Sequence, residues 1–143
     1  MASAAYTRTA KYLEAKGWHI ANAQRWIQRA FLKIDLFGLA DMVAVRHDPG
    51  SGTWFINVCD DNGEVAEHID KYMNGWDHPK KGRMPPNSHL PVILSAGNRF
   101  SIFAWGMRNS AGRGSRKVRT LRVTEAYLDK AEVKWKEIVE VDA

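Results

Sequence analysis

The chain has 143 residues, of which 45% are hydrophobic and 26% are charged, and its formal net charge is +5. This length and composition predict one domain, residues 1–143, that is large enough to form a hydrophobic core. No stretch approaches the roughly 18 consecutive apolar residues that a membrane-spanning helix needs, so we expect no membrane partner. The first residues also lack the basic and then apolar order of a signal peptide, which favours a cytoplasmic location.

Capping and turn signals divide the first half of the chain into one helix and several strands. Ser3 can cap a helix that runs to about Lys16 and stops at Gly17. Gln28–Lys33 is predicted to be a bridge or one limb of a hairpin, and the Pro/Gly-rich residues 47–52 predict a turn between two strands. The strands predicted in this half are Trp18–Ile27, Leu39–Arg46 and Thr53–Cys59.

The second half is predicted to contain a short helix and further strands. The helix runs from Glu64 to Met73 and ends at Asn74 and Gly75, and Trp76–His89 is predicted to be a loop. The tail, Thr124–Val139, is predicted as one helix or as a helix followed by a strand from Val133. The strands predicted in this half are Leu90–Ser95, Phe100–Met107 and Lys117–Val123. This order of elements predicts an α/β or α+β sheet with helices packed on it.

The positive charge is concentrated in residues 107–122. This segment holds six of the 21 lysines and arginines and no acidic residue, so the rest of the chain carries 15 basic and 16 acidic residues. Such a patch fits a polyanion, above all nucleic acid, although a solvated flexible loop has the same composition. The six residues are Arg108, Arg113, Arg116, Lys117, Arg119 and Arg122.

A second basic segment surrounds Trp76 in the predicted loop. Trp76 can stack on an unpaired base while Lys80 and Lys81 hold phosphates. The alternative is that the tryptophan only pins the loop to the body of the protein.

Histidine and cysteine residues do not predict a zinc site or a disulfide. Cys59 is the single cysteine, which excludes an internal disulfide and fits a reducing compartment. The five histidines show no i, i+4 spacing among themselves and no companion cysteine, whereas a structural zinc site needs about four such ligands.

The residues most indicative of a catalytic site lie on two predicted neighbouring strands. Asp41 heads an apolar run, where a carboxylate is costly unless it binds a metal or pairs with a donor. It can therefore be a metal ligand, or it can cap a loop or pair with an arginine. Asn57 and Cys59 are two residues apart in the next strand and so share one face. Asp35 either joins this site or anchors the loop that presents Asp41.

Four segments together resemble the PD-(D/E)xK nuclease superfamily, in particular its small resolvase-like members from phages and prokaryotes. They are DLFGLAD leading into a strand, the FINVC run, the helix after it and the later FAWGMR run. The resemblance implies a restriction-endonuclease-like fold, a mixed β-sheet flanked by helices. It further implies a Mg²⁺- or Mn²⁺-dependent DNA endonuclease in a bacterial or phage-infected cell, acting as a homodimer when both strands are cut.

The resemblance also implies roles for individual residues. Asp41 falls on the metal-binding aspartate of the superfamily, while its second carboxylate and its lysine fall on Asn57 and Cys59. An asparagine oxygen can ligate Mg²⁺ without charge, but a neutral thiol cannot replace the cationic lysine. Relocated groups would then supply the missing charges. The implied catalytic residues are Asp41, Asn57 and Lys71, and the implied metal ligands are Asp41, Asp35, Asp60 and Asp61.

These departures leave a second hypothesis open. The chain can be a nuclease-fold protein that has lost catalysis and binds DNA or a protein partner through its basic patch. A third hypothesis is an interaction domain that binds no nucleic acid.

Overall fold

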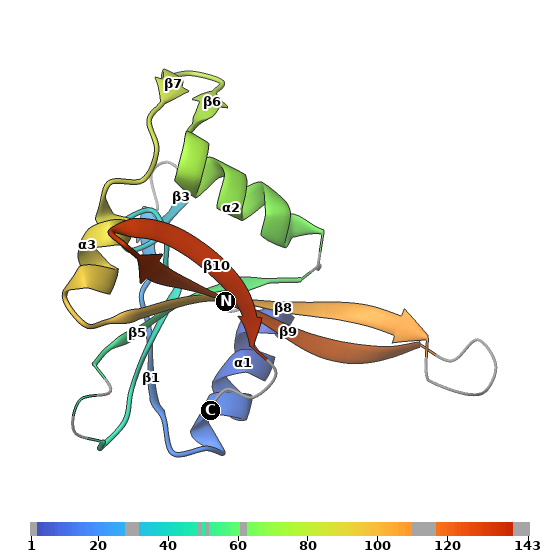
Figure 1. Cartoon of the computed structure of the whole chain (residues 1–143). Coiled ribbons are helices and arrows are strands. Elements are labelled where there is room, and N and C mark those ends of the chain that lie inside the picture. The colour runs from blue at the N-terminus through green and yellow to red at the C-terminus, as the bar shows by residue number, and fades with distance from the viewer. Residues whose placement is uncertain are drawn as a thin grey trace.

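The computed structural model describes residues 3–27, 32–48, 50, 52–60, 63–109 and 117–138. Six strands of these ranges form one mixed sheet in the order β1-β4-β5-β8-β9-β10, and two small hairpins, β2–β3 and β6–β7, stand beside it (Figure 1). The elements are α1 (Ala4–Glu14), β1 (His19–Asn22), β2 (Arg25–Ile27), β3 (Leu32–Ile34), β4 (Met42–Val45), β5 (Trp54–Cys59), α2 (Glu64–Asn74), β6 (Trp76–His78), β7 (Gly82–Met84), α3 (His89–Ser95), β8 (Arg99–Asn109), β9 (Lys117–Asp129) and β10 (Glu132–Ile138).

The sheet combines two antiparallel parts with one parallel junction. Strands β5 and β8 are parallel, and the other paired strands of this sheet are antiparallel. A parallel pair needs a long crossover connection, and here α2, the β6–β7 hairpin and α3 supply it. The predicted mixed sheet flanked by helices is therefore confirmed at the level of an α/β architecture.

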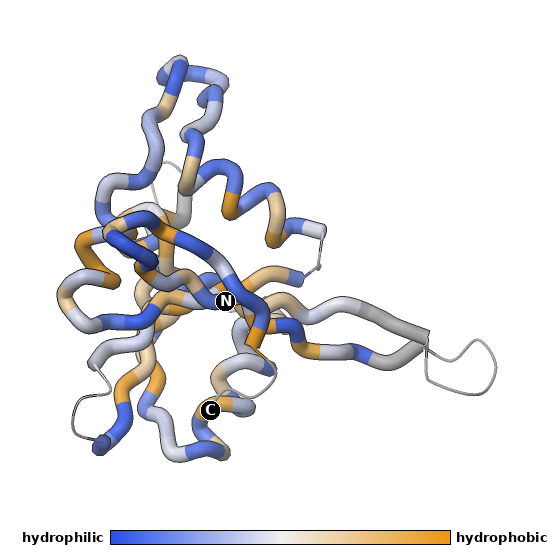
Figure 2. Tube along the Cα trace, viewed as in Figure 1, coloured by the Kyte–Doolittle hydropathy of each residue, from blue (hydrophilic) through white to orange (hydrophobic). Residues whose placement is uncertain are grey.

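Helices cover both faces of the sheet. In β8, Phe103 packs with Leu13 of α1, whereas its neighbours Ile102 and Ala104 pack with Tyr72 of α2. This alternation is the period of two that a strand imposes on its side chains. Figure 2 shows apolar residues along the central strands, while the β6–β7 hairpin is mostly hydrophilic. Among the described residues, no helix is both long enough and apolar enough to cross a membrane.

The first helix forms where the capping signal predicts it. The Ser3 hydroxyl accepts a hydrogen bond from the backbone N–H of Tyr6 at 3.1 Å. Ala5, Thr9 and Leu13, spaced by four, are the buried residues of α1. The predictions for β5 and α2 are likewise confirmed to within one residue at each end.

The segment Leu90–Ser95 is a helix, so the prediction of a strand there is wrong. The Asn87 side-chain oxygen accepts hydrogen bonds from the backbone N–H groups of His89 and Leu90, at 2.9 and 3.1 Å, and begins α3. Pro91 is tolerated in this first turn because its missing N–H has no partner to lose. Leu90 and Ile93, three apart, are then buried against the sheet.

The tail is a β-hairpin, so the helix predicted to begin at Thr124 is wrong, whereas the strand from Val133 in the second alternative is confirmed as β10. Strand β9 runs through Thr124 to Asp129, and β10 returns antiparallel beside it. Val133 and Trp135 alternate with exposed residues and pack against the core. Burial of this apolar face outweighs the helix propensity of the local sequence.

Three further boundaries differ from the predictions. The predicted strand Trp18–Ile27 is two strands, because β1 joins the main sheet while β2 pairs with β3. The predicted loop Trp76–His89 contains the β6–β7 hairpin and the start of α3. Strand β4 begins only at Met42, so Asp41 stands at its entrance.

Candidate functional site

Asp41 is held against β5 by its backbone and its side chain. Its N–H donates to the Ile56 carbonyl at 3.0 Å, and its Oδ2 accepts from the Val58 N–H at 3.3 Å. Its own carbonyl accepts a hydrogen bond from Ala23 at 3.0 Å. The residue is only 8% exposed, so the predicted carboxylate at the mouth of a buried strand is present.

The charge of Asp41 acts on helices from both faces of the sheet. Burial, followed by the charges of Asp41 and Glu14, raises the pKa of Tyr6 on α1 above its ordinary value. Burial also raises the pKa of Tyr72 on α2, and the charges of Asp35 and Asp41 contribute to that rise. The negative charge of Asp41 therefore contributes to the pKa of one phenol on each of these two helices.

Asn57 and Cys59 share a face as predicted, and they contact each other. The Cys59 thiol donates to the Asn57 Oδ1 at 3.5 Å, and the Asn57 Nδ2 donates to the Leu39 carbonyl at 3.1 Å. Both residues are buried. In this arrangement the amide anchors the 35–41 segment to β5, a role that the sequence did not reveal.

Asp35 borders an open pocket of about 490 Å³ between α2, the β6–β7 hairpin and the start of α3. Gln24 donates from its Nε2 to the Asp35 Oδ1 at 3.1 Å and fixes one wall. Lys71 and Trp76 line the same pocket, with the Lys71 ammonium 4.9 Å from the centre of the indole ring. Lys71 therefore shares the pocket with Asp35 and stacks on Trp76.

Not every implied metal ligand joins Asp41 or Asp35. Asp60 is exposed and directly follows the last residue of β5, where the chain leaves the sheet. Asp61 lies outside the described residues. Asp41 and Asp35 are thus the carboxylates that the structure brings to the neighbourhood of Tyr72.

The basic residues fall on two separate projections. Arg119 is exposed on β9, whereas Arg122 pairs with Glu137 of β10, with 3.2 Å between Nε and Oε2. The charge of Arg122 is therefore compensated. Lys80 and Lys81 are exposed at the turn of the β6–β7 hairpin. Arg108 and Lys117 lie in β8 and β9, without described side chains, and Arg113 and Arg116 lie outside the described residues.

Strands β8 and β9 extend beyond the rest of the sheet as a two-stranded ribbon. The β5–β8 pairing ends at Cys59 opposite Ala104, while the β8–β9 pairing continues to Asn109 opposite Lys117. Residues 105–109 therefore carry the ribbon about 17 Å past β5, as Figure 1 shows. It leaves the sheet at the end where β5 finishes and where Asp41 precedes β4.

A cluster of potential metal ligands, which the sequence prediction missed, lies where β5 leads into α2. One ligand atom each from Cys59, Glu64 and His68 lies within 4.8 Å of the others. Burial is the main cause that lowers the pKa of His68 below its ordinary value, so the imidazole is neutral near pH 7. We expected no histidine to lie beside Cys59, and this expectation is wrong, because α2 places His68 within 4.8 Å of the thiol.

No family model matches this chain, and no curated protein or solved structure matches it. Its described residues define a mixed α/β protein in which Asp41 and the base of the β8–β9 ribbon lie at one end of the sheet, and Asp35 lines the pocket beside α2.

Proposed function

We propose that this chain is a divalent-cation-dependent DNA endonuclease of the PD-(D/E)xK type, with a resolvase-like preference for DNA structure. One observation carries the proposal: the basic β8–β9 ribbon leaves the sheet at the end where Asp41 is fixed. A two-stranded ribbon fits the major groove of a duplex, and basic side chains on it neutralise phosphates. DNA held by the ribbon would pass close to the Asp41 carboxylate.

The order of the elements supports a restriction-endonuclease-like fold. Asp41 precedes β4, the FINVC run forms β5, α2 follows, and the FAWGM residues lie in β8. The four segments that carry the family resemblance thus occur in consecutive parts of one sheet and its crossover helix.

The donor set fits a hard cation such as Mg²⁺ or Mn²⁺. Asp41 and Asp35 would supply carboxylate oxygens, which these ions prefer. The Asn57 Oδ1 would join them by giving up the hydrogen bond that it accepts from the Cys59 thiol and binding the cation instead. When bound, the cation would supply an activated water and neutralise the charge of the scissile phosphate.

The remaining residues of the site position the substrate. Lys71 brings a positive charge into the pocket that Asp35 lines, where it can bind a phosphate oxygen. A tyrosine is protonated near pH 7, and burial raises the pKa of Tyr72 further, so its hydroxyl keeps its proton and can donate a hydrogen bond. Asn57 holds the Leu39 carbonyl and so keeps the Asp41 segment in place.

Plasmid, linear and branched DNA incubated with the protein and Mg²⁺ or Mn²⁺ test this function. We expect cleavage that Asp41→Asn reduces by about 100-fold or more, because a principal metal ligand is lost. Asp48→Asn is the matched control, since Asp48 is an exposed aspartate near the other end of β4 and pairs with Arg46. Absence of cleavage with either ion, or equal activity of the two variants, would contradict the proposal.

A non-catalytic DNA-binding protein is the second candidate. The hydrogen bond between Cys59 and Asn57 favours it, because both positions that would carry the second-strand chemistry are engaged with each other. This candidate predicts salt-sensitive DNA retention without cleavage, with or without a protein partner. Cleavage of both strands would instead favour a homodimer, because each strand needs its own Asp41. The compartment that we propose for this enzyme, on the family resemblance alone, is the cytoplasm of a bacterial or phage-infected cell.

A further inference from the structure

We propose that Cys59, Glu64 and His68 bind a transition-metal ion of the zinc class, at a site distinct from the Asp41 and Asp35 carboxylates. Cys59 is the last residue of β5, and the other two lie one turn apart in α2. Their ligand atoms, a thiol sulfur, a carboxylate oxygen and a ring nitrogen, all lie within 4.8 Å of one another.

The spacing of these atoms is close to that of a tetrahedral site. Zinc bonds of about 2.0–2.3 Å place neighbouring tetrahedral ligands about 3.3–3.7 Å apart. Because no pair of these ligand atoms is more than 4.8 Å apart, no pair would need to approach by more than about 1.5 Å. Glu64 is exposed in the first turn of α2, so rotation of its side chain can supply this movement.

Two of the three ligands are already positioned by packing. Cys59 is buried in the sheet, 2% exposed. The His68 ring stacks on Tyr72 with ring centres 6.0 Å apart and an angle of 29° between the planes. Glu64 and His68 are four residues apart, so they share one face of α2. The strand end and the helix thus hold Cys59 and His68 with little freedom to lose on binding, and Glu64 is the ligand that must be ordered.

The chemistry of the donors selects the class of metal. A thiolate and an imidazole favour zinc and related borderline ions, whereas Mg²⁺ prefers oxygen ligands and waters. On binding, the Cys59 S–H bond breaks, its proton passes to solvent, and the sulfur lone pair forms the metal–sulfur bond. The hydrogen bond from this thiol to Asn57 is then lost. Three protein ligands leave a fourth position for water.

Titration of the metal-free full-length chain with Co²⁺ and then Zn²⁺ tests the site without DNA. We expect a thiolate-to-cobalt charge-transfer band with four-coordinate visible absorption, and its loss when one equivalent of Zn²⁺ displaces the cobalt. Cys59→Ser should remove the charge-transfer band. His68→Gln and Glu64→Gln should each weaken Zn²⁺ binding by at least about tenfold, measured by competition with a chromophoric chelator.

Matched controls separate this site from scattered surface binding. His47→Gln and Glu67→Gln change an exposed histidine and an exposed glutamate, the latter on α2 itself, and should leave Zn²⁺ affinity unchanged. Circular dichroism checks that each variant is folded. His68→Gln and Glu64→Gln keep the buried Cys59, so they test the site even if Cys59→Ser does not fold. Absence of the charge-transfer band, or equal weakening in the controls, overturns the proposal. Asp41→Asn should reduce DNA cleavage by about 100-fold or more but keep Zn²⁺ affinity, so the two proposals can fail separately.

Discussion

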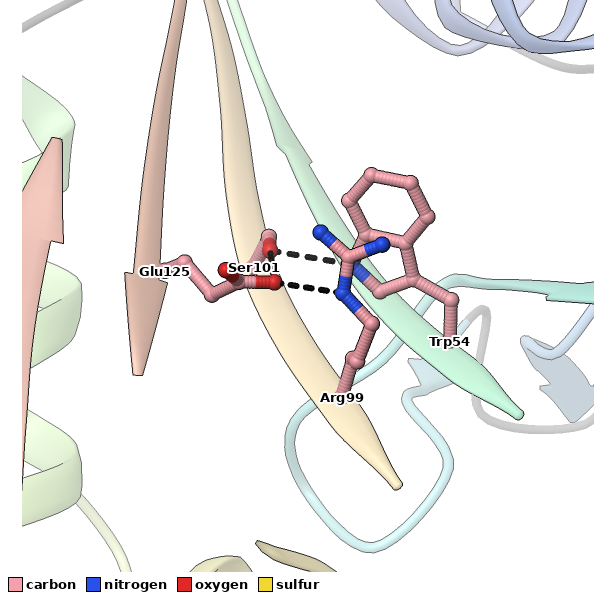
Figure 3. Close-up of polar contacts among 4 residues, drawn as sticks. All are labelled: Trp54, Arg99, Ser101 and Glu125. Carbon is pink, nitrogen blue, oxygen red and sulfur yellow. Dashed lines mark hydrogen bonds and ion pairs between the residues drawn. The ribbon is translucent and has the colours of Figure 1, made fainter. Parts of the chain in front are cut away.

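At the scale of single residues, a polar network joins three strands on the α1 face of the sheet (Figure 3). The Trp54 Nε1 donates to the Ser101 Oγ at 2.9 Å, and that hydroxyl donates to the Glu125 Oε1 at 3.4 Å. Arg99 donates to the same oxygen at 2.7 Å, and its guanidinium lies 3.7 Å from the centre of the Trp54 ring. Glu125 is therefore the acceptor on which the network converges, at the end of β5 and β8 away from the ribbon.

Glu125→Gln is predicted to destabilise the fold. The substitution keeps the shape but removes the charge from an acceptor whose side chain is 13% exposed. Hydrogen bonds to a charged group contribute about 1.5–3 kcal/mol, so we expect the free energy of unfolding to fall by about 1–3 kcal/mol. Urea unfolding followed by circular dichroism measures it.

Glu137→Gln is the matched control for this prediction. Glu137 also pairs with an arginine across neighbouring strands, Arg122, but its side chain is 52% exposed. Exposed pairs contribute little, so we expect a change within about 0.5 kcal/mol. A loss in Glu137→Gln equal to that in Glu125→Gln would show that burial is not the cause.

The candidate site was predictable only where one residue carries the signal. Asp41 stands out because a carboxylate at the head of an apolar run needs a partner, and the structure gives it the backbone of β5. The cluster of Cys59, Glu64 and His68 depends on how α2 packs against β5, which local sequence does not determine. A search for a cysteine followed by a glutamate and a histidine one helical turn apart would have found it.

At the scale of elements, the β9–β10 turn is strained by its sequence. Lys130 and Ala131 have φ angles of 51° and 66°, in the left-handed region that residues with a Cβ rarely adopt. A two-residue hairpin turn with both angles positive favours Asn-Gly. The double substitution Lys130→Asn, Ala131→Gly should therefore raise the free energy of unfolding by about 1 kcal/mol.

Denaturant unfolding of this variant is best compared with Ala96→Gly. Ala96 caps the C-terminus of α3 with φ at −80°, so a glycine there relieves no left-handed strain and only adds freedom to the unfolded chain. We expect no stabilisation from the control. If Ala96→Gly stabilised as much as the turn variant, strain at residues 130–131 would not be the explanation.

The same hairpin shows why the segment that begins at Thr124 was predicted as a helix. Leu, Glu, Lys and Ala residues between 124 and 139 favour a helix locally, and the turn lacks glycine and asparagine. The pairing of β10 with β9 and the burial of Trp135 against Phe100 decide the outcome. In contrast, α1 and α2 were predictable because the Ser3 cap of α1 and the glycine stops of both helices are local signals. Short apolar segments such as α3 do not distinguish a helix from a strand by pattern alone.

At the scale of the whole molecule, the basic residues form two arms that project in different directions. The β8–β9 ribbon extends from the sheet, while the β6–β7 hairpin rises above the end of α2 (Figure 1). Composition predicted the charge excess near residues 107–122, but the ribbon shape follows only from the register of β8 with β9 beyond β5. In the hairpin, Arg83 is paired with Asp77 at 3.4 Å, which reduces its positive field.

DNA binding is predicted to depend on the ribbon more than on the hairpin. The logarithm of the binding constant falls linearly with the logarithm of salt concentration, by about one unit of slope for each phosphate contact. Substituting Lys117 and Arg119 by glutamine should lower the slope by about two, because both lie on the projecting part of β9. Substituting Lys80 and Lys81 in the same way should leave the slope nearly unchanged.

Fluorescence anisotropy with one labelled duplex between about 50 and 200 mM salt measures both slopes under identical conditions. The comparison is matched, because each double variant removes two positive charges and the two variant proteins carry the same net charge. An equal loss of affinity in the two double variants would then reflect total charge. A loss confined to the ribbon variant would locate the duplex on β8 and β9. If only the Lys80 and Lys81 variant lost slope, the duplex would lie over the pocket beside Trp76, and the ribbon would not be the DNA-binding element.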